Sequence, residues 1–303
     1  MEGGNLKRAK LIPDFHRRLF RRLHLPVQSL AVGRNTGGWQ SRLPQKQWDC
    51  HDNSQERTVQ PMLEDWQDAF GHEIHDYFNG KGGYEIIERD DGFFSVSSGP
   101  KFYFTEYEEW DASEKEAIRH VRGRVLDVGC GAGRHSLHLQ AQGFDVVGID
   151  ISPLAIQVCR ARGLRDARVL PITQLSRRVG IFDTILMLGN NFALMGNGKR
   201  AKWLLRRFHK MTSGAGTVIA QTRDPTQTDV PEHLAYHARN REKGTTPGQA
   251  RIRVRYKKYV TPWIDFLMVS KEELTAILEG TNWQVRQFIE GQQGVYIAIL
   301  EAV

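Results

Sequence analysis

Cysteine is scarce in this chain of 303 residues, which contains only Cys50, Cys130 and Cys159. The number is odd and no pair has C-x-x-C spacing, which argues against both a disulfide framework and a zinc site built on cysteines. Long apolar runs are also lacking. No stretch approaches the roughly 18 uninterrupted apolar residues that a membrane span requires, so we expect the main body to stay in solution. The low cysteine usage fits a reducing cytoplasm.

Net negative charge is absent, since the formal net charge at pH 7 is +7. The excess lies in the first 60 residues, which hold 11 Lys and Arg against 5 Asp and Glu, whereas residues 61–303 hold 31 against 30. This nearly neutral larger part gives little electrostatic reason to expect a substrate with a phosphate backbone.

Residues 1–60 are predicted to be a basic and mostly disordered extension, because they combine Gly37-Gly38, scattered proline and a polar run over 53–57. One segment, 13–25, alternates apolar and arginine residues at helical spacing. Such a basic amphipathic helix suits contact with an anionic membrane or RNA, or organelle targeting. The alternative is that the whole segment is a dispensable extension.

Residues 61–122 are predicted to form an N-terminal cap of helices and a hairpin. Apolar residues recur at helical spacing over 63–78, and two short strand patterns, 84–87 and 93–96, flank the turn sequence Asp90-Asp91-Gly92. A further helix is expected to end near Val121. His72 and His75 lie three apart without a third ligand nearby, so we expect surface residues and no metal site.

Residues 123–224 alternate short strands with helices. This order predicts an α/β core in which a parallel sheet is covered by helices on both faces, because parallel strands need crossover connections. The expected strands are 124–129, 145–150, 167–170, 182–188 and 216–222, and the expected helices are 133–142, 153–162 and 198–211.

Beyond residue 224 the alternation stops. Residues 225–269 are predicted to be a β-rich insertion that covers the substrate, with a helix around 233–241 and strands 251–260 and 263–269 about the turn at Thr261-Pro262. Residues 270–303 are predicted to complete the core with helix 270–279 and a hairpin of strands 283–289 and 294–301.

The sequence VLDVGCGAGRH, residues 125–135, places three glycines directly after the first core strand. Gly129 permits a tight turn, and Gly131 and Gly133 clear space at the start of the next helix, where a Cβ would obstruct a ligand. Asp127 is placed to accept a hydrogen bond from an ammonium group. The loop is therefore predicted to bind a nucleotide-like cofactor.

Asp150 ends the next strand, VVGID, where a carboxylate can accept both hydroxyls of a ribose. A dinucleotide motif needs glycine or alanine where this chain has Arg134, and a diphosphate would sit badly beside Asp127. S-adenosylmethionine satisfies Asp127 and Asp150 together, because it combines a cationic amino-acid end with adenosine.

The chain resembles the class I S-adenosylmethionine-dependent methyltransferases through VLDVGCGAGRH, VVGIDISPLAI and FDTILMLGNNFALM. The resemblance implies a Rossmann-like seven-stranded sheet whose last strand is antiparallel. It also implies that the glycine loop, with Cys130 as a small filler and not a nucleophile, holds the methionine part. Ile151 and Ile172 would contact the adenine, and Leu188 and Gly189 the sulfonium side.

The segment LGNNFALM is similar to the LGNSFAHL segment of glycine and sarcosine N-methyltransferases. That resemblance implies a carboxylate-bearing acceptor held by Asn190, with Asn191 beside it. QTRDP resembles their HRNYD and implies a carboxylate-pairing role for Arg223. Two structural alternatives stay open, in which Asn190 caps the following loop and Arg223 pairs with Asp224 or Asp229.

Methyl transfer from a sulfonium is an in-line displacement, which positioning in a dry pocket accelerates without an indispensable acid or base. No catalytic residue is therefore assigned. Tyr103 and Tyr107 are candidates for contacting the acceptor, and with His233 and His237 for accepting a proton, against the alternative of ordinary packing or surface placement.

We expect a methyltransferase that acts on a small molecule. The second hypothesis is an RNA or protein methyltransferase guided by the basic extension. The N/D-P-P-Y/F sequence common in enzymes that methylate the amino groups of bases is absent from residues 189–192. The third is a cofactor-binding regulator without catalysis.

Overall fold

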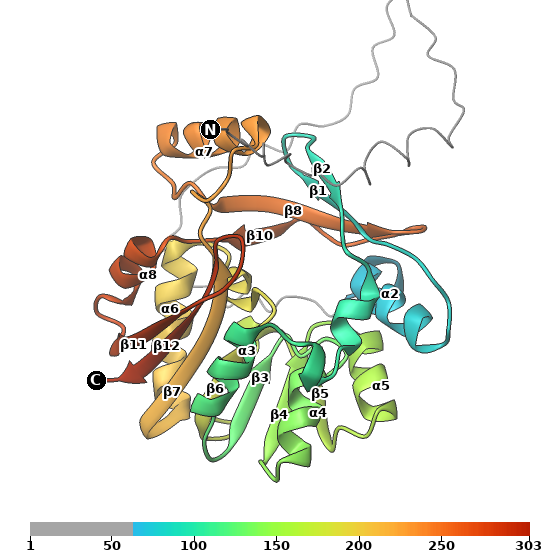
Figure 1. Cartoon of the computed structure of the whole chain (residues 1–303), viewed down its shortest axis with the longest axis vertical. Helices are drawn as coiled ribbons and strands as arrows, with labels where there is room; N and C mark the ends of the chain where they lie inside the picture. The colour runs from blue at the N-terminus through green and yellow to red at the C-terminus, as the bar shows by residue number, and fades with distance from the viewer. Residues whose placement is uncertain (1–62) are drawn as a thin grey trace, which may run out of the picture. The chain divides into compact units, whose positions relative to one another are not determined.

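The computed structural model describes residues 63–303, so the predicted extension over 1–60 and its amphipathic segment 13–25 lie outside the described residues. The described part contains a seven-stranded core sheet and a smaller sheet that crosses one end of it (Figure 1).

The core sheet has the strand order β11-β12-β7-β6-β3-β4-β5. The five neighbouring strands β7, β6, β3, β4 and β5 are parallel to one another. Strand β12 runs antiparallel to both of its neighbours, β7 and β11. The predicted α/β fold class is confirmed, including the antiparallel last strand. The bounds are β3 (Val125–Val128), β4 (Val146–Asp150), β5 (Asp166–Val169), β6 (Phe182–Met187), β7 (Thr212–Arg223), β11 (Trp283–Glu290) and β12 (Val295–Ala302).

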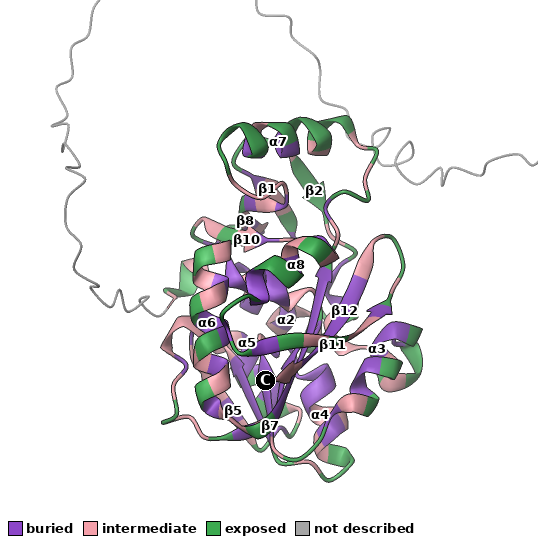
Figure 2. Cartoon of the chain, turned by 90° about the vertical axis from the view of Figure 1, so that its left-hand side faces the viewer, coloured by how far each residue is buried: buried purple, intermediate pink, exposed green. Residues whose placement is uncertain are grey.

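Helices cover both faces of the core sheet. One face packs on α6 and α8 through residues such as Phe208 and Leu274, and the other packs on α3 and α4 through Ala117 and Leu139. The strands between them are largely buried (Figure 2), as expected for apolar parallel strands with both faces covered. The helices are α3 (Ala112–Ala117), α4 (Arg134–Ala141), α5 (Pro153–Ala161), α6 (Gly198–Met211) and α8 (Lys271–Leu278).

The smaller sheet joins two segments that are far apart in the sequence. Its strand order is β10-β8-β1-β2, with β9 paired to β8. Ile87 of the N-terminal hairpin lies opposite Val254 in an antiparallel pair, so the predicted cap and the predicted insertion share one sheet. The bounds are β1 (Ile86–Arg89), β2 (Phe94–Val96), β8 (Gln249–Tyr256), β9 (Tyr259–Val260) and β10 (Ile264–Leu267).

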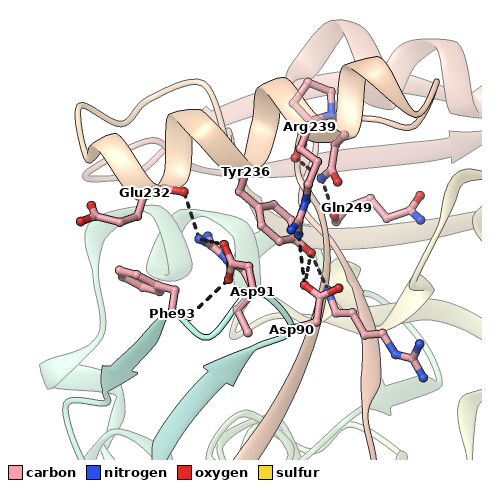
Figure 3. Close-up of polar contacts among 11 residues, drawn as sticks. Asp90, Asp91, Phe93, Glu232, Tyr236, Arg239 and Gln249 are labelled. Carbon is pink, nitrogen blue, oxygen red and sulfur yellow. Dashed lines mark hydrogen bonds and ion pairs between the residues drawn. The ribbon is translucent and has the colours of Figure 1, made fainter. Parts of the chain in front are cut away.

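Helix α7 (Pro231–Glu242) braces the smaller sheet from its outer side (Figures 1 and 3). The Tyr236 hydroxyl donates a 2.7 Å hydrogen bond to Asp90 Oδ1 in the hairpin turn. Arg89 pairs with Asp91 at 2.8 Å and donates to the Glu232 carbonyl oxygen at 3.0 Å. These contacts fix the hairpin turn to a helix more than 130 residues later in the chain.

The helix expected over 63–78 is interrupted. A 3₁₀ helix, η1 (Asp65–Gln67), precedes α2 (Ala69–Phe78), and Asp68 separates them. The Asp68 carboxylate accepts hydrogen bonds from the Gly71 N–H at 3.0 Å and from the Ser152 hydroxyl at 2.8 Å. Apolar periodicity continues across this break, but Asp68 acts as the N-cap of α2 and ties it to the core.

The two strands expected over 251–260 and 263–269 turn at a different place. Strand β8 ends at Tyr256, and the chain reverses through Lys257, whose φ is 52°, so that Tyr259 pairs back onto Tyr256. The Val254 N–H donates to the Thr261 hydroxyl at 2.9 Å, which holds the returning segment in place. The short 3₁₀ helices are η2 (Pro100–Phe104), η3 (Tyr107–Glu109), η4 (Ile118–His120), η5 (Ile172–Gln174) and η6 (Asn191–Met195).

None of the helices within residues 63–303 has the length and apolarity that crossing a bilayer requires. The predicted compartment stays a prediction. In the same residues no group of three His, Cys, Asp or Glu side chains is arranged for a metal ion. His72 pairs with Asp65 at 3.0 Å and stacks on Tyr259, with ring centroids 3.4 Å apart.

Candidate active site

A cavity of about 600 Å³ lies between the core sheet and the smaller sheet. Its floor comes from the carboxyl ends of β3, β4 and β6 and from the loop after β5, and β1, β8 and β10 line the opposite side. Ligands of open α/β sheets bind at this edge. The volume is within the range of small-molecule sites.

The three glycines of the predicted loop have different surroundings. All three have positive φ, of 74° at Gly129, 56° at Gly131 and 81° at Gly133. A Cβ on Gly129 would lie 2.7 Å from Asn191 Nδ2, and one on Gly133 would lie 3.1 Å from Cys159 Sγ. A Cβ on Gly131 would instead face the cavity, 3.6 Å from Tyr103 Cδ1. Gly131 therefore leaves room for a ligand. Gly133 does not line the cavity, and a glycine is favoured there by the positive φ and by the close packing against Cys159.

The Asp150 carboxylate lines the cavity and is fixed by two backbone groups. Oδ2 accepts a hydrogen bond from the Gly131 N–H at 3.0 Å, and Oδ1 accepts one from the Ser152 N–H at 2.9 Å. Burial raises the pKa of Asp150, and both hydrogen bonds oppose that rise. Each oxygen keeps capacity to accept another hydrogen bond.

Asp127 lies in β3 just before the glycine loop, and Cys130 lies within the loop. Asp127 is 2% exposed and accepts a 2.6 Å hydrogen bond from the Ser136 hydroxyl. Its burial raises its pKa to about 6. Its carboxylate does not line the cavity, so the structure does not support the predicted direct contact with an ammonium group. Cys130 does line the cavity, and its Sγ lies 3.8 Å from Cys159 Sγ.

Apolar side chains lie on both sides of Asp150. Ile151 and Ile172 line the cavity together with Leu170, and Leu188 and Gly189 line it from the end of β6. These four predicted contact residues are therefore brought to one space with Asp150. Thr173 lines the same region, where no acidic residue follows β5.

The two asparagines after β6 differ in role. Asn191 Nδ2 donates to the carbonyl oxygens of Val128 and Gly129, at 2.9 and 2.8 Å, so this amide positions the glycine loop. Asn190 lines the cavity with φ at 65°, and its buried Oδ1 has no hydrogen-bond partner. Its side chain makes no capping hydrogen bond to η6, so the alternative of a loop cap is wrong.

Arg223 is not part of the cavity. It is exposed at the end of β7, two residues beyond Gln221. Gln221 is the residue of this strand that contacts the loop after β6, because its Oε1 accepts a 3.1 Å hydrogen bond from the Asn190 N–H. The predicted anchoring of an acceptor carboxylate by Arg223 is therefore wrong for this cavity, because the strand carries the residue beyond it. Within residues 63–303, Arg223 also forms no ion pair with Asp224 or Asp229.

Of the four candidate proton acceptors, only Tyr103 lines the cavity. Tyr107 stacks on His138 of α4 with ring centroids 4.6 Å apart. His233 contacts the Thr228 hydroxyl at 3.2 Å, and His237 is a buried residue of α7 itself. Burial lowers the pKa of both histidines. Tyr107, His233 and His237 thus have packing roles.

Comparison with known proteins agrees with a cofactor site of the methyltransferase type at this edge of the sheet. A family model described as a methyltransferase domain matches residues 125–216. The chain is similar to the S-adenosylmethionine-dependent methyltransferase from Bacteroides fragilis solved in complex with S-adenosyl-L-homocysteine. That similarity has a TM-score of 0.69 and 25% identity and covers 80% of this chain and 98% of that one.

The chain contains a methyltransferase domain over residues 125–216, and its fold is that of the class I S-adenosylmethionine-dependent methyltransferases. These similarities support the predicted class of enzyme and the predicted cofactor.

Two curated relatives of this chain are named glycine/sarcosine N-methyltransferase. The one from Halorhodospira halochloris is 29% identical over 130 residues, which are 38% of this chain and 48% of that protein. The one from Parasynechococcus marenigrum is 33% identical over 115 residues, 35% of this chain and 39% of that protein. The chain thus spans about half or less of the length of these relatives.

Three of the charged residues that line the cavity, Arg134, Arg200 and Glu85, were not predicted from the sequence, and Asp68 and Asp265 line it as well. Arg134 donates to Thr105 Oγ1 at 2.9 Å and pairs with Glu114, and Arg200 Nε donates to the Met195 carbonyl oxygen at 2.7 Å.

The third missed residue, Glu85, is 3% exposed and lines the cavity from the start of the hairpin. Its burial raises its pKa to about 7, against the opposing effect of the Tyr103 and Ser97 hydroxyls. The sequence signal that could have revealed Glu85 as a buried acid is its place within the otherwise apolar segment YEII, residues 84–87.

Proposed function

We propose that this protein transfers a methyl group from S-adenosylmethionine to a small-molecule acceptor held in the same cavity. The observation that carries the proposal is the continuity of that cavity, which reaches from Gly131 and Asp150 to the smaller sheet. A volume of about 600 Å³ is within the range of small-molecule sites.

The residues present fit the cofactor. We assign the ribose hydroxyls to Asp150, whose carboxylate is already oriented by Gly131 and Ser152. Ile151 and Ile172 would enclose the adenine, and the loop of Gly129, Cys130 and Gly131 would hold the methionine part. Leu188 and Gly189 would flank the sulfonium. When bound, the cofactor supplies an electrophilic methyl group on a cationic sulfur.

The chain's own contribution is orientation and exclusion of water. The smaller sheet covers the cavity with apolar side chains from Ile87, Ile252 and Phe266, and α7 holds that sheet in place through the Tyr236–Asp90 contact. A dry and preorganised site favours displacement at a sulfonium, because its charge is dispersed as the reaction proceeds.

A carboxylate on the acceptor remains part of the proposal, with a different anchor. The relatives named above act on glycine and sarcosine according to their names, which favours such an acceptor. Two arginines line the cavity, Arg134 and Arg200, whereas Arg223 does not. Arg134 is already paired with the buried Glu114, so Arg200 is the anchor that we propose for the carboxylate. Burial lowers the pKa of Arg200, but a guanidinium stays protonated, and its planar fork suits a carboxylate. Asn190 would add its free amide oxygen or nitrogen to the same acceptor.

The test supplies the full chain with methyl-labelled S-adenosylmethionine and, in separate reactions, a metabolite extract, total RNA and a protein extract. We expect label to accumulate in the small-molecule reaction beyond one equivalent per protein. Label confined to RNA or protein would favour the polymer alternative. Binding of S-adenosylhomocysteine without any transfer would favour a regulator.

A further inference from the structure

Glu85 is a buried carboxylate without a full set of partners. Its Oε1 accepts a 3.3 Å hydrogen bond from the Tyr103 hydroxyl, and its Oε2 has no hydrogen-bond partner. Its backbone N–H donates to Oε1 of Glu73 at 3.1 Å, and Glu73 is fully buried with its own Oε2 unpartnered. A second buried carboxylate thus contacts the backbone of the residue whose side chain lines the cavity.

No cation of the described part of the chain neutralises them. Neither Glu85 nor Glu73 takes part in an ion pair within residues 63–303. Arg134 is engaged by Glu114 and Thr105, and Arg200 donates to backbone carbonyls on another wall. A buried charge is costly unless it is paired, so a ligand cation is the partner that this carboxylate lacks.

Tyr103 connects Glu85 to the cofactor region. Tyr103 Cδ1 lies 3.6 Å from the position of a Cβ on Gly131, and the hydroxyl of the same ring donates to Glu85. The carboxylate is therefore one tyrosine side chain away from the glycine loop.

We propose that Glu85 binds the ammonium group of the acceptor and takes its proton, so that the acceptor is an amine with an apolar substituent. This inference rests on the proposed methyl transfer and names the residue and the substrate class for it. The apolar substituent follows from the remaining lining, which includes Phe70, Ile87, Phe102, Ile252, Val254 and Phe266.

The step balances without a further reactant. The acceptor ammonium gives one proton to a Glu85 carboxylate oxygen, which leaves a lone pair on nitrogen. That lone pair forms the C–N bond to the methyl carbon while the C–S bond breaks and its electron pair stays on sulfur. The products are a protonated N-methylamine and the neutral thioether S-adenosylhomocysteine. The proton on Glu85 leaves to solvent when the product departs.

The experiment compares two probes of nearly equal shape, benzylammonium and benzyl alcohol, by calorimetry on the full chain saturated with S-adenosylhomocysteine. No reaction takes place under these conditions, so binding is read alone. At about pH 8 Glu85 is ionised, and we expect benzylammonium to bind at least tenfold tighter than benzyl alcohol. Equal affinities, or no measurable binding of benzylammonium, would overturn the proposal on the wild-type protein alone.

The variant Glu85→Gln keeps the shape and removes the charge, so the preference for benzylammonium should disappear while S-adenosylhomocysteine still binds. The matched control is Glu88→Gln, because Glu88 lies three residues further along the chain, in β1, but pairs with Arg253 and Arg255 outside the cavity. It should keep the preference. A preference retained in Glu85→Gln would overturn the proposal.

Failure of this inference is distinguishable from failure of the proposed function. If wild-type protein does not bind S-adenosylhomocysteine, the methyl transfer itself is contradicted. If it binds this product and labels a metabolite at oxygen, sulfur or carbon, the methyl transfer stands and the amine acceptor is wrong.

Discussion

The backbone N–H of Gly131 donates a 3.0 Å hydrogen bond to Oδ2 of Asp150, which joins the loop after β3 to the end of β4. Because Oδ1 is held by the Ser152 N–H, the carboxylate has a fixed orientation before any ligand binds. Preorganisation of this kind spares a ligand the cost of ordering the group that receives it.

Replacing Asp150 by Asn should weaken binding of S-adenosylhomocysteine about 10- to 100-fold. The physical reason is the loss of charge-assisted hydrogen bonds, each worth about 1.5–3 kcal/mol. Calorimetry of the purified variant gives the affinity. The control is Asp145→Asn, since Asp145 is exposed and pairs with Arg124 at 2.8 Å away from the cavity. Equal losses in both variants would contradict the assignment.

Replacing Gly131 by Ala should lower affinity for S-adenosylhomocysteine, whereas Gly143→Ala should not. Both glycines have positive φ, 56° and 91°, so both variants lose roughly 1–2 kcal/mol of stability. A Cβ on residue 131 enters the cavity, because Gly131 lines it. A Cβ on residue 143 has nothing within 4 Å, and Gly143 does not line the cavity. Urea unfolding and calorimetry separate the two effects. An unchanged affinity in Gly131→Ala would show that the loop does not contact the cofactor.

Replacing Arg200 by Lys should raise the KM for a carboxylate-bearing acceptor about tenfold, which corresponds to roughly 1.4 kcal/mol. Lysine keeps the charge but lacks the planar fork of donors. Arg223→Lys should leave the KM unchanged, since Arg223 is exposed outside the cavity. Steady-state kinetics with the acceptor found by labelling provide the measurement. The reverse ranking would restore Arg223 as the anchor.

The stability of the wild-type protein relative to Glu85→Gln should fall as pH rises from about 4.5 to about 7. Burial raises the pKa of Glu85 from 4.5 to about 7 in the folded state, so between these values the unfolded chain releases a proton that the folded chain keeps. The contribution of Glu85 to the free energy of unfolding is therefore fully present below pH 4.5 and is lost as pH passes 7. The change across this range is on the order of 3 kcal/mol.

Urea unfolding of both proteins across this pH range measures the difference. Buried Asp127 and His135, with pKa values of about 6 and about 4, titrate in both proteins and cancel. A difference that does not change with pH would contradict the account of Glu85.

The core sheet was predictable from sequence because its signals are local. Apolar strands such as Val125–Val128 and the cap Ser152 before Pro153 each specify their own element within a few residues. Asp150 and Ile172 then follow from the rule that parallel strands present their carboxyl ends on one edge.

The smaller sheet and part of the site were not predictable for a different reason. Pairing of Ile87 with Val254 joins segments 167 positions apart, and no local pattern encodes that register. It is this pairing that brings Glu85 over the core. Arg223 illustrates the same limit, because similarity of QTRDP to a family segment does not reveal that β7 carries the arginine past the cavity.

Calorimetric titration of the full-length protein with S-adenosylhomocysteine tests the central claim most directly. The account predicts saturable binding at one site per chain and its marked weakening in Asp150→Asn. Absence of binding by S-adenosylhomocysteine and S-adenosylmethionine, together with firm binding of NADH, would contradict it.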